Sequence, residues 1–201
     1  MKYVFWDTET TGLTLQDEVI QMAGIVTDTD FKMEGSFNFY CETAHPISKK
    51  AASVNKLSYE VIHKLSNGLY FEDQFYDVVK YLGSEVCWIS WSTNGFDERL
   101  VRQTLNKVHR PLYDFGTKLV QLNEASGVCN LNAMRVVCRE HYKGSERPLS
   151  FVFKDLIGEL NPTMTKFYME KLNKHGRPVE AHDAMYDSFI MYLLMLKEHK
   201  C

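Results

Sequence analysis

Two acidic residues near the N-terminus, Asp7 and Glu9, have the type and spacing of metal ligands. They lie in the stretch V-F-W-D-T-E-T-T-G-L (residues 4–13), which begins as an apolar, β-rich run and ends in a turn signal, and so predicts a strand. Side chains alternate along a strand, so both carboxylates would project from one face, and Trp6 and Thr8 from the other. Two carboxylates on an otherwise buried strand need compensation, and oxygen ligands suit Mg²⁺ or Mn²⁺.

A chance origin of this pair is the simple alternative. In a chain with 24% charged residues, an Asp-x-Glu pair arises easily and usually lies on a solvated surface. A metal site therefore requires further carboxylates downstream.

Asp97 is the first downstream candidate. It follows the apolar run at residues 86–91, at the start of a predicted helix. Ligands usually bind at strand ends in open α/β sheets, but an Asp at a helix N-terminus is also an ordinary capping residue.

His182 and Asp187 are the second pair of candidates, five residues apart in A-H-D-A-M-Y-D-S. Five residues of α-helix turn by about 140°, so the two would not share a helix face. We expect His182 in the loop or cap before the helix and Asp187 in its first two turns. With seven histidines in the chain, a surface role is the alternative for His182, whereas a charge inside an apolar helix needs a reason.

The elements that position these residues alternate between strands and helices, which predicts an α/β fold. Three strands with short connections suit an antiparallel meander, and a later strand after a helix implies a crossover, so we expect a mixed sheet. The further predicted strands are residues 18–27, 35–42 and 86–91; the predicted helices are residues 48–65 (in two pieces), 71–82, 97–108, 115–125, 131–142, 151–160, 164–173 and 183–197.

Composition favours one folded domain over residues 1–201. The chain is 45% hydrophobic and 13% aromatic, and it can bury a sizeable core. Its formal net charge of −3 argues against coating nucleic acid by bulk charge, but not against gripping a strand end through metal ions and a few local contacts.

Cysteine usage and the N-terminus favour a cytoplasmic setting. The five cysteines are widely spaced and contain no Cys-x-x-Cys pair, so neither a disulfide framework nor a structural zinc site is expected. We find no signal-peptide pattern and no apolar run that would span a membrane.

In order, Asp7-x-Glu9, the N-G-F-D run that ends at Asp97, and His182-x4-Asp187 resemble the three-motif signature of the DEDDh 3′–5′ exonucleases. This DnaQ-like family includes proofreading subunits and RNase T. Residues 45–58 (H-P-I-S-K-K-A-A-S-V-N-K-L-S) are similar to the family's segment after the third strand. The resemblance implies a ribonuclease H-like sheet of about five strands, the first three antiparallel, flanked by helices.

Two features depart from the family pattern. The family often has one more residue between the Asn and Asp of the second motif, and a longer apolar lead-in than Ser92-Thr93. Residues 128–179 carry no strong family pattern, and we expect an insertion there.

The resemblance implies a two-metal hydrolysis of phosphodiester bonds at the 3′ end of single-stranded or frayed DNA or RNA, releasing nucleoside 5′-monophosphates. Two divalent cations, Mg²⁺ or Mn²⁺, would be held by four carboxylates, with Asp7 touching both, and His182 would be the general base. The implied metal ligands are Asp7, Glu9, Asp97 and Asp187.

Substrate contacts are implied for the loop after the first motif and for the second motif. The residues concerned are Thr10, Gly12, Leu13 and Asn94. Core packing is an equal alternative for Leu13. Trp91 or Phe96 would suit base stacking, although core packing is the usual role of such aromatics.

Three other classes compete with the exonuclease. A catalytically silent nuclease fold that binds nucleic acid or serves a polymerase would lack a ligand, and none is missing here. A ribonuclease H-type endonuclease shares the acidic sheet but not the His-x4-Asp ending, and a small-molecule metallohydrolase would not need the loop after the first motif. DNA or RNA preference, a homodimer and a replication partner all stay open.

Overall fold

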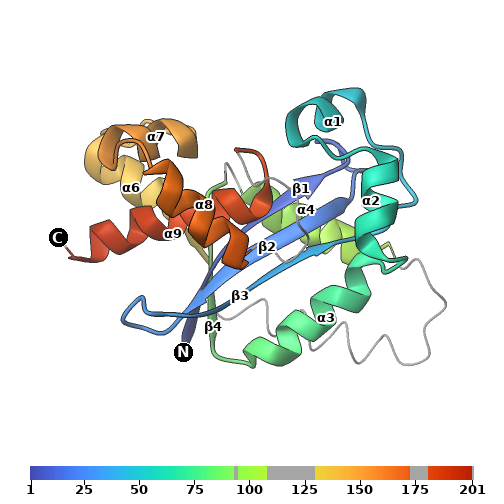
Figure 1. Ribbon diagram of the computed structural model, residues 1–201, viewed down its shortest axis with the longest axis horizontal. Coiled ribbons are helices and arrows are strands. Elements are labelled where there is room, and N and C mark those ends of the chain that lie inside the picture. Colours follow the sequence, from blue (N-terminus) through green and yellow to red (C-terminus); the bar gives the residue numbers. More distant parts are fainter. Residues whose placement is uncertain (93–94, 108–129, 173–180, 201) are drawn as a thin grey trace.

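The computed structural model describes residues 1–92, 95–107, 130–172 and 181–200 (Figure 1). Asn94 and the helix predicted at residues 115–125 lie outside the described residues. So do parts of the predicted insertion at 128–179, which stays a prediction.

One mixed sheet forms the centre of the described part of the chain, with strands in the order β3-β2-β1-β4-β5. β1 (Lys2–Thr10) pairs antiparallel with β2 (Val19–Thr27), and β2 pairs antiparallel with β3 (Met33–Tyr40). On its other side β1 pairs parallel with β4 (Val86–Ser90), which pairs parallel with β5 (Asn130–Asn132). This confirms the predicted mixed α/β fold with an antiparallel meander, and it puts β1 in the middle of the sheet.

Helices cover both faces of this sheet (Figure 1). One face packs against α3 (Phe71–Leu82) and α4 (Phe96–Leu105). The other face packs against α6 (Ala133–His141), α7 (Leu149–Leu156), α8 (Pro162–Leu172) and α9 (Ala184–Lys200). α1 (Lys49–Asn55) and α2 (Tyr59–Ser66) follow β3, and α2 packs with the buried Ile20 and Tyr40 near the strand ends.

Side-chain alternation along β1 divides the core in two. Phe5 packs into the cluster that contains α9, whereas Val4 and Trp6 pack with α3 and α4. By the same alternation, Asp7 and Glu9 project toward the α9 layer and Thr8 toward the α4 layer. The predicted division of this strand is therefore confirmed.

Two strands differ from the prediction. β3 begins and ends two residues earlier than predicted, because its ladder is fixed by pairing Met33 with Thr27 and Tyr40 with Gln21, after which the backbone N–H of Glu42 donates to Leu69 instead. β5 was not predicted: it is three residues long and polar, and it is a strand only because it pairs with β4. Pairing with a neighbouring strand sets the bounds of β3 and the existence of β5, and the local sequence pattern does not indicate such pairing.

The boundaries of α1, α2 and α3 follow local signals closely, whereas α7 begins two residues and ends four residues before the helix predicted at 151–160. α3 has the predicted bounds and ends at Gly83, which has a φ of 80°. The predicted helix at 48–65 is two helices, each begun by a serine, Ser48 and Ser58, whose side chain accepts a backbone hydrogen bond. None of the helices described has both the length and the apolar character needed to cross a bilayer.

Candidate active site

Three carboxylates from two elements meet at the face of β1 that α9 covers. Asp7 and Glu9 belong to β1, and Asp187 lies in the first turn of α9. One oxygen of each lies within 4.8 Å of the others, and all three side chains are half-buried. We call these three residues the acidic centre. Carboxylates this close repel one another unless protons or a cation lie between them.

Asp97 approaches the same place from the opposite layer. It is the second residue of α4, is buried, and accepts a hydrogen bond of 2.7 Å from Thr8 Oγ1. The cap position of α4 is Gly95, so Asp97 is not the N-cap. Asp97 lies outside the three-residue cluster, but its charge is the neighbouring charge that most raises the pKa of Asp7. All four predicted acidic ligands therefore lie at one end of β1.

The pKa values of this group are shifted upward. Burial, followed by repulsion from the other carboxylates, raises the pKa of Asp7 and of Glu9 well above their usual values. Burial raises the pKa of Asp97 to about 6 and that of Asp187 to about 7. The folded chain therefore holds protons that an unfolded chain releases, and a divalent cation would replace them.

A pH-dependent stability follows from these shifts. Because the native state binds more protons than the unfolded state, the free energy of unfolding in EDTA should fall as pH rises from about 4 to about 7. Above pH 7, Mg²⁺ or Mn²⁺ should restore the lost stability by binding the native state. Urea unfolding at several pH values, with EDTA or with metal, measures both effects. A stability that rises over this range in EDTA would contradict the prediction.

His182 lies in the turn that leads into α9, as expected. Its side chain is exposed, and its φ of 65° is unusual for a residue with a side chain. Its backbone N–H donates a hydrogen bond to the Asp187 carboxylate. Burial raises the pKa of Asp187, and this hydrogen bond lowers it by a smaller amount. His182, Asp7 and Asp187 line a common cleft of about 510 Å³, so the predicted histidine stands beside the acidic centre.

Two polar residues of this site were missed in the sequence. Buried Asp183 accepts hydrogen bonds of 3.1 Å from Gln21 Nε2 and 3.0 Å from the backbone N–H of Met185, so it ties the start of α9 to β2. Its place just before a helix was an available capping signal. Buried Asn55 donates to the carbonyl of Thr10 at 3.3 Å and hydrogen-bonds the Glu9 carboxylate.

The predicted substrate residues lie on the loop after β1. Thr10 is buried, and its Oγ1 donates to the carbonyl of Gly12 at 2.7 Å. A Cβ at Gly12 would come within 2.6 Å of the Asp17 carboxylate, so any other residue would have to displace that carboxylate. Leu13 is 64% exposed, and the core alternative for this residue is therefore wrong.

The two aromatics considered for stacking separate in the structure. Phe96 is half-buried and packs against the core cluster of α3 and α4. Trp91 is half-buried and lines the cleft of the acidic centre. Of the two, only Trp91 borders the candidate site.

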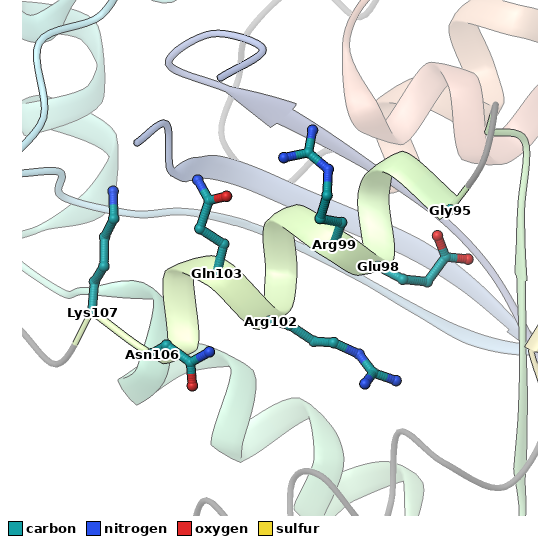
Figure 2. Close-up of a pocket in the computed structure, with 7 residues that line it drawn as sticks. All are labelled: Gly95, Glu98, Arg99, Arg102, Gln103, Asn106 and Lys107. Carbon is teal, nitrogen blue, oxygen red and sulfur yellow. The ribbon is translucent and has the colours of Figure 1, made fainter. Parts of the chain in front are cut away.

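α4 supports the loop after β1 from the outside (Figure 2). Gln103 donates to the carbonyls of Thr14 and Asp17, and Lys107 pairs with Glu18 at 3.4 Å. A hollow of about 620 Å³ also lies along this helix (Figure 2). Its lining comprises Gly95, Glu98, Arg99, Arg102, Gln103, Asn106 and Lys107. The helix that carries Asp97 thus also holds the loop that carries Leu13.

Comparison with known families identifies the class of protein. The RNase T family, described as exonuclease, matches residues 4–195. The chain therefore belongs to the exonuclease family, and its acidic motifs with His-x4-Asp are of the DEDDh, DnaQ-like type. No curated protein matches the sequence.

Solved structures of exonuclease I share the fold. The zinc-ion-bound form of the E. coli ExoI–ssDNA complex has a TM-score of 0.64 at 20% identity, covering 97% of this chain and 39% of that one. A second structure of exonuclease I, which is described as suggesting how processivity is achieved, has a TM-score of 0.67 at 20% identity. The match covers 96% of this chain and 39% of that one. A moderately thermophilic exonuclease I from Methylocaldum szegediense has a TM-score of 0.63 at 20% identity, covering 99% and 40%.

At 20% identity these similarities show a shared fold, and that fold is the predicted ribonuclease H-like fold. The chain spans about two fifths of the length of these exonucleases.

Proposed function

We propose that this protein is a metal-dependent 3′–5′ exonuclease. It removes nucleoside 5′-monophosphates from the 3′ end of single-stranded or frayed DNA, or of RNA. The observation that carries the proposal is the acidic centre of Asp7, Glu9 and Asp187, with Asp97 next to it and His182 on the same cleft. Family membership supports the reaction class, and the single-stranded DNA in the exonuclease I complexes supports the substrate.

The carboxylates suit two divalent cations. Asp7, Glu9, Asp97 and Asp187 supply only oxygen ligands, which Mg²⁺ and Mn²⁺ prefer. Burial, and then repulsion between the carboxylates, raises the pKa of Asp7 and of Glu9, and bound cations would offset both costs. When bound, two such cations stabilise the charge on the attacking and leaving oxygens. The charges of Asp97, Asp187 and Glu9 all act on Asp7 and raise its pKa after burial, so Asp7 is the candidate to contact both cations.

His182 is the candidate general base. Its imidazole is exposed at the cleft, so water and substrate reach it. Among the described residues that line this cleft it is the only histidine, and imidazole is the side chain that most often serves as a general base. It takes the proton of the attacking water, and Asp187 fixes the turn that presents it through the backbone N–H of His182.

The test is a cleavage assay on matched strands. Purified protein is incubated with 5′-labelled single-stranded DNA or RNA of the same sequence, with Mg²⁺, Mn²⁺ or EDTA. We expect a ladder that shortens by one nucleotide at a time, depends on metal and disappears in EDTA. Internal cuts would instead assign an endonuclease, and binding without cleavage would assign a silent fold that serves another protein.

A further inference from the structure

The cleft beside the acidic centre extends beyond the residues assigned so far. Its walls come from the end of β4, from α6, from the loop between α6 and α7, and from the turn before α9. Its lining comprises Asp7, Trp91, Met134, Glu146, Arg147, Pro148, Leu149, Ser150, Ala181, His182 and Asp187. None of the motifs recognised in the sequence includes the loop at residues 142–148, so the role of this wall is unassigned.

Arg147 is held at this wall by its own backbone. The indole Nε1 of Trp91 donates to the carbonyl of Arg147 at 3.1 Å, which ties the loop to the end of β4. Pro148 follows at once and α7 begins at Leu149, so the chain on the other side is fixed as well. The Arg147 side chain itself is exposed, with its guanidinium 5.7 Å from the centre of the Phe151 ring.

The charge of Arg147 is unusual for its surroundings. Asp7, Asp187 and Glu146 make the cleft acidic, and Arg147 is the one permanent cation among the described residues that line it. Within the part of the chain that the structure describes, no carboxylate forms an ion pair with its guanidinium. A free guanidinium fits an oxyanion, above all phosphate, which it binds through two parallel hydrogen bonds.

We propose that Arg147 binds the second phosphate from the 3′ end of the substrate, with Trp91, Pro148 and Leu149 as an apolar wall for the penultimate nucleotide. The inference rests on the proposed function. The terminal nucleotide of a 3′ end carries one phosphodiester, the scissile one, and that phosphate belongs at the acidic centre. The next phosphate lies one nucleotide further along the strand, and Arg147 supplies the positive charge on the same cleft.

Cleavage of two dinucleotides distinguishes a contact with the second phosphate from an effect on the scissile phosphate. A dithymidine with a 5′-hydroxyl contains only the scissile phosphate, whereas the 5′-phosphorylated form also contains the second. We expect Arg147→Gln to lower kcat/KM on the phosphorylated form by about tenfold, mainly through KM, and to leave the other form unchanged. Arg147→Lys should recover part of the loss. Arg102→Gln, an exposed arginine on α4, should change neither.

Two other outcomes of the cleavage assay would overturn the inference. An equal loss on both dinucleotides would place Arg147 at the scissile phosphate or in the fold, and no loss on either would remove it from substrate binding. Calorimetric binding of the same two dinucleotides in Ca²⁺ gives a readout without turnover. If the wild type cleaves neither but binds the phosphorylated form more tightly through Arg147, the proposed function fails and this contact stands.

Discussion

Replacing Asp7 by Asn should abolish cleavage and at the same time stabilise the apo protein. Activity should fall by about a thousandfold or more, because the substitution removes a proposed metal ligand at the acidic centre. Stability should rise, because the half-buried Asp7 carboxylate is partly desolvated and is repelled by Asp97, Asp187 and Glu9. A gain of about 1 kcal/mol raises the melting temperature by about 2–4 °C in a domain of this size. Cleavage assays and calorimetric melting in EDTA measure the two effects.

Asp77→Asn is the matched control for that variant. Asp77 is an exposed residue of α3, on the opposite face of the sheet, and its substitution should change neither activity nor melting temperature appreciably. A lower melting temperature for Asp7→Asn in EDTA would mean that the carboxylate of Asp7 supports the fold, which contradicts the repulsion argued above.

Replacing His182 by Asn should remove the proposed general base without disturbing the turn. His182 has a φ of 65°, and Asn tolerates this left-handed conformation better than most residues. We expect kcat to fall by about 10²- to 10⁴-fold, which is the usual contribution of a general base. Mn²⁺ binding, measured by calorimetry, should be unchanged, because the ligands are carboxylates.

His141→Gln provides the comparison for the histidine variant. His141 lies on α6, where it contacts Glu198 at 2.9 Å, and its substitution should leave kcat near the wild-type value. If His182→Asn keeps full activity, another group takes the proton. If it loses Mn²⁺ binding as well, His182 is a ligand rather than a base.

Much of the site could be predicted because its residues conflict with their surroundings. Asp7 and Glu9 follow an apolar run, and Asp187 lies inside an apolar helix. Burying charge is costly, so such positions draw attention in a single sequence. Alternation along β1 predicted the face from which Asp7 and Glu9 project, and the helix predicted at residues 183–197 placed Asp187 in its first two turns.

Residues that act through tertiary contacts could not be predicted in the same way. Asn55 and Arg147 are ordinary polar residues in the sequence, and only packing brings them to Thr10 and to the cleft. The same limit explains β5, whose three residues become a strand by pairing with β4. Such contacts join positions that are distant in the chain, and local sequence patterns do not indicate them.

The placement of Asp97 and Asp187 on opposite sides of the sheet links folding to chemistry. Asp97 arrives with α4 and Asp187 with α9, and β1 lies between the two layers. A chain that has docked only one layer has at most three of the four acidic ligands in position. If the proposed function holds, a newly made or partly unfolded copy should not cut nucleic acid until the long-range contacts between β1 and α9 have formed.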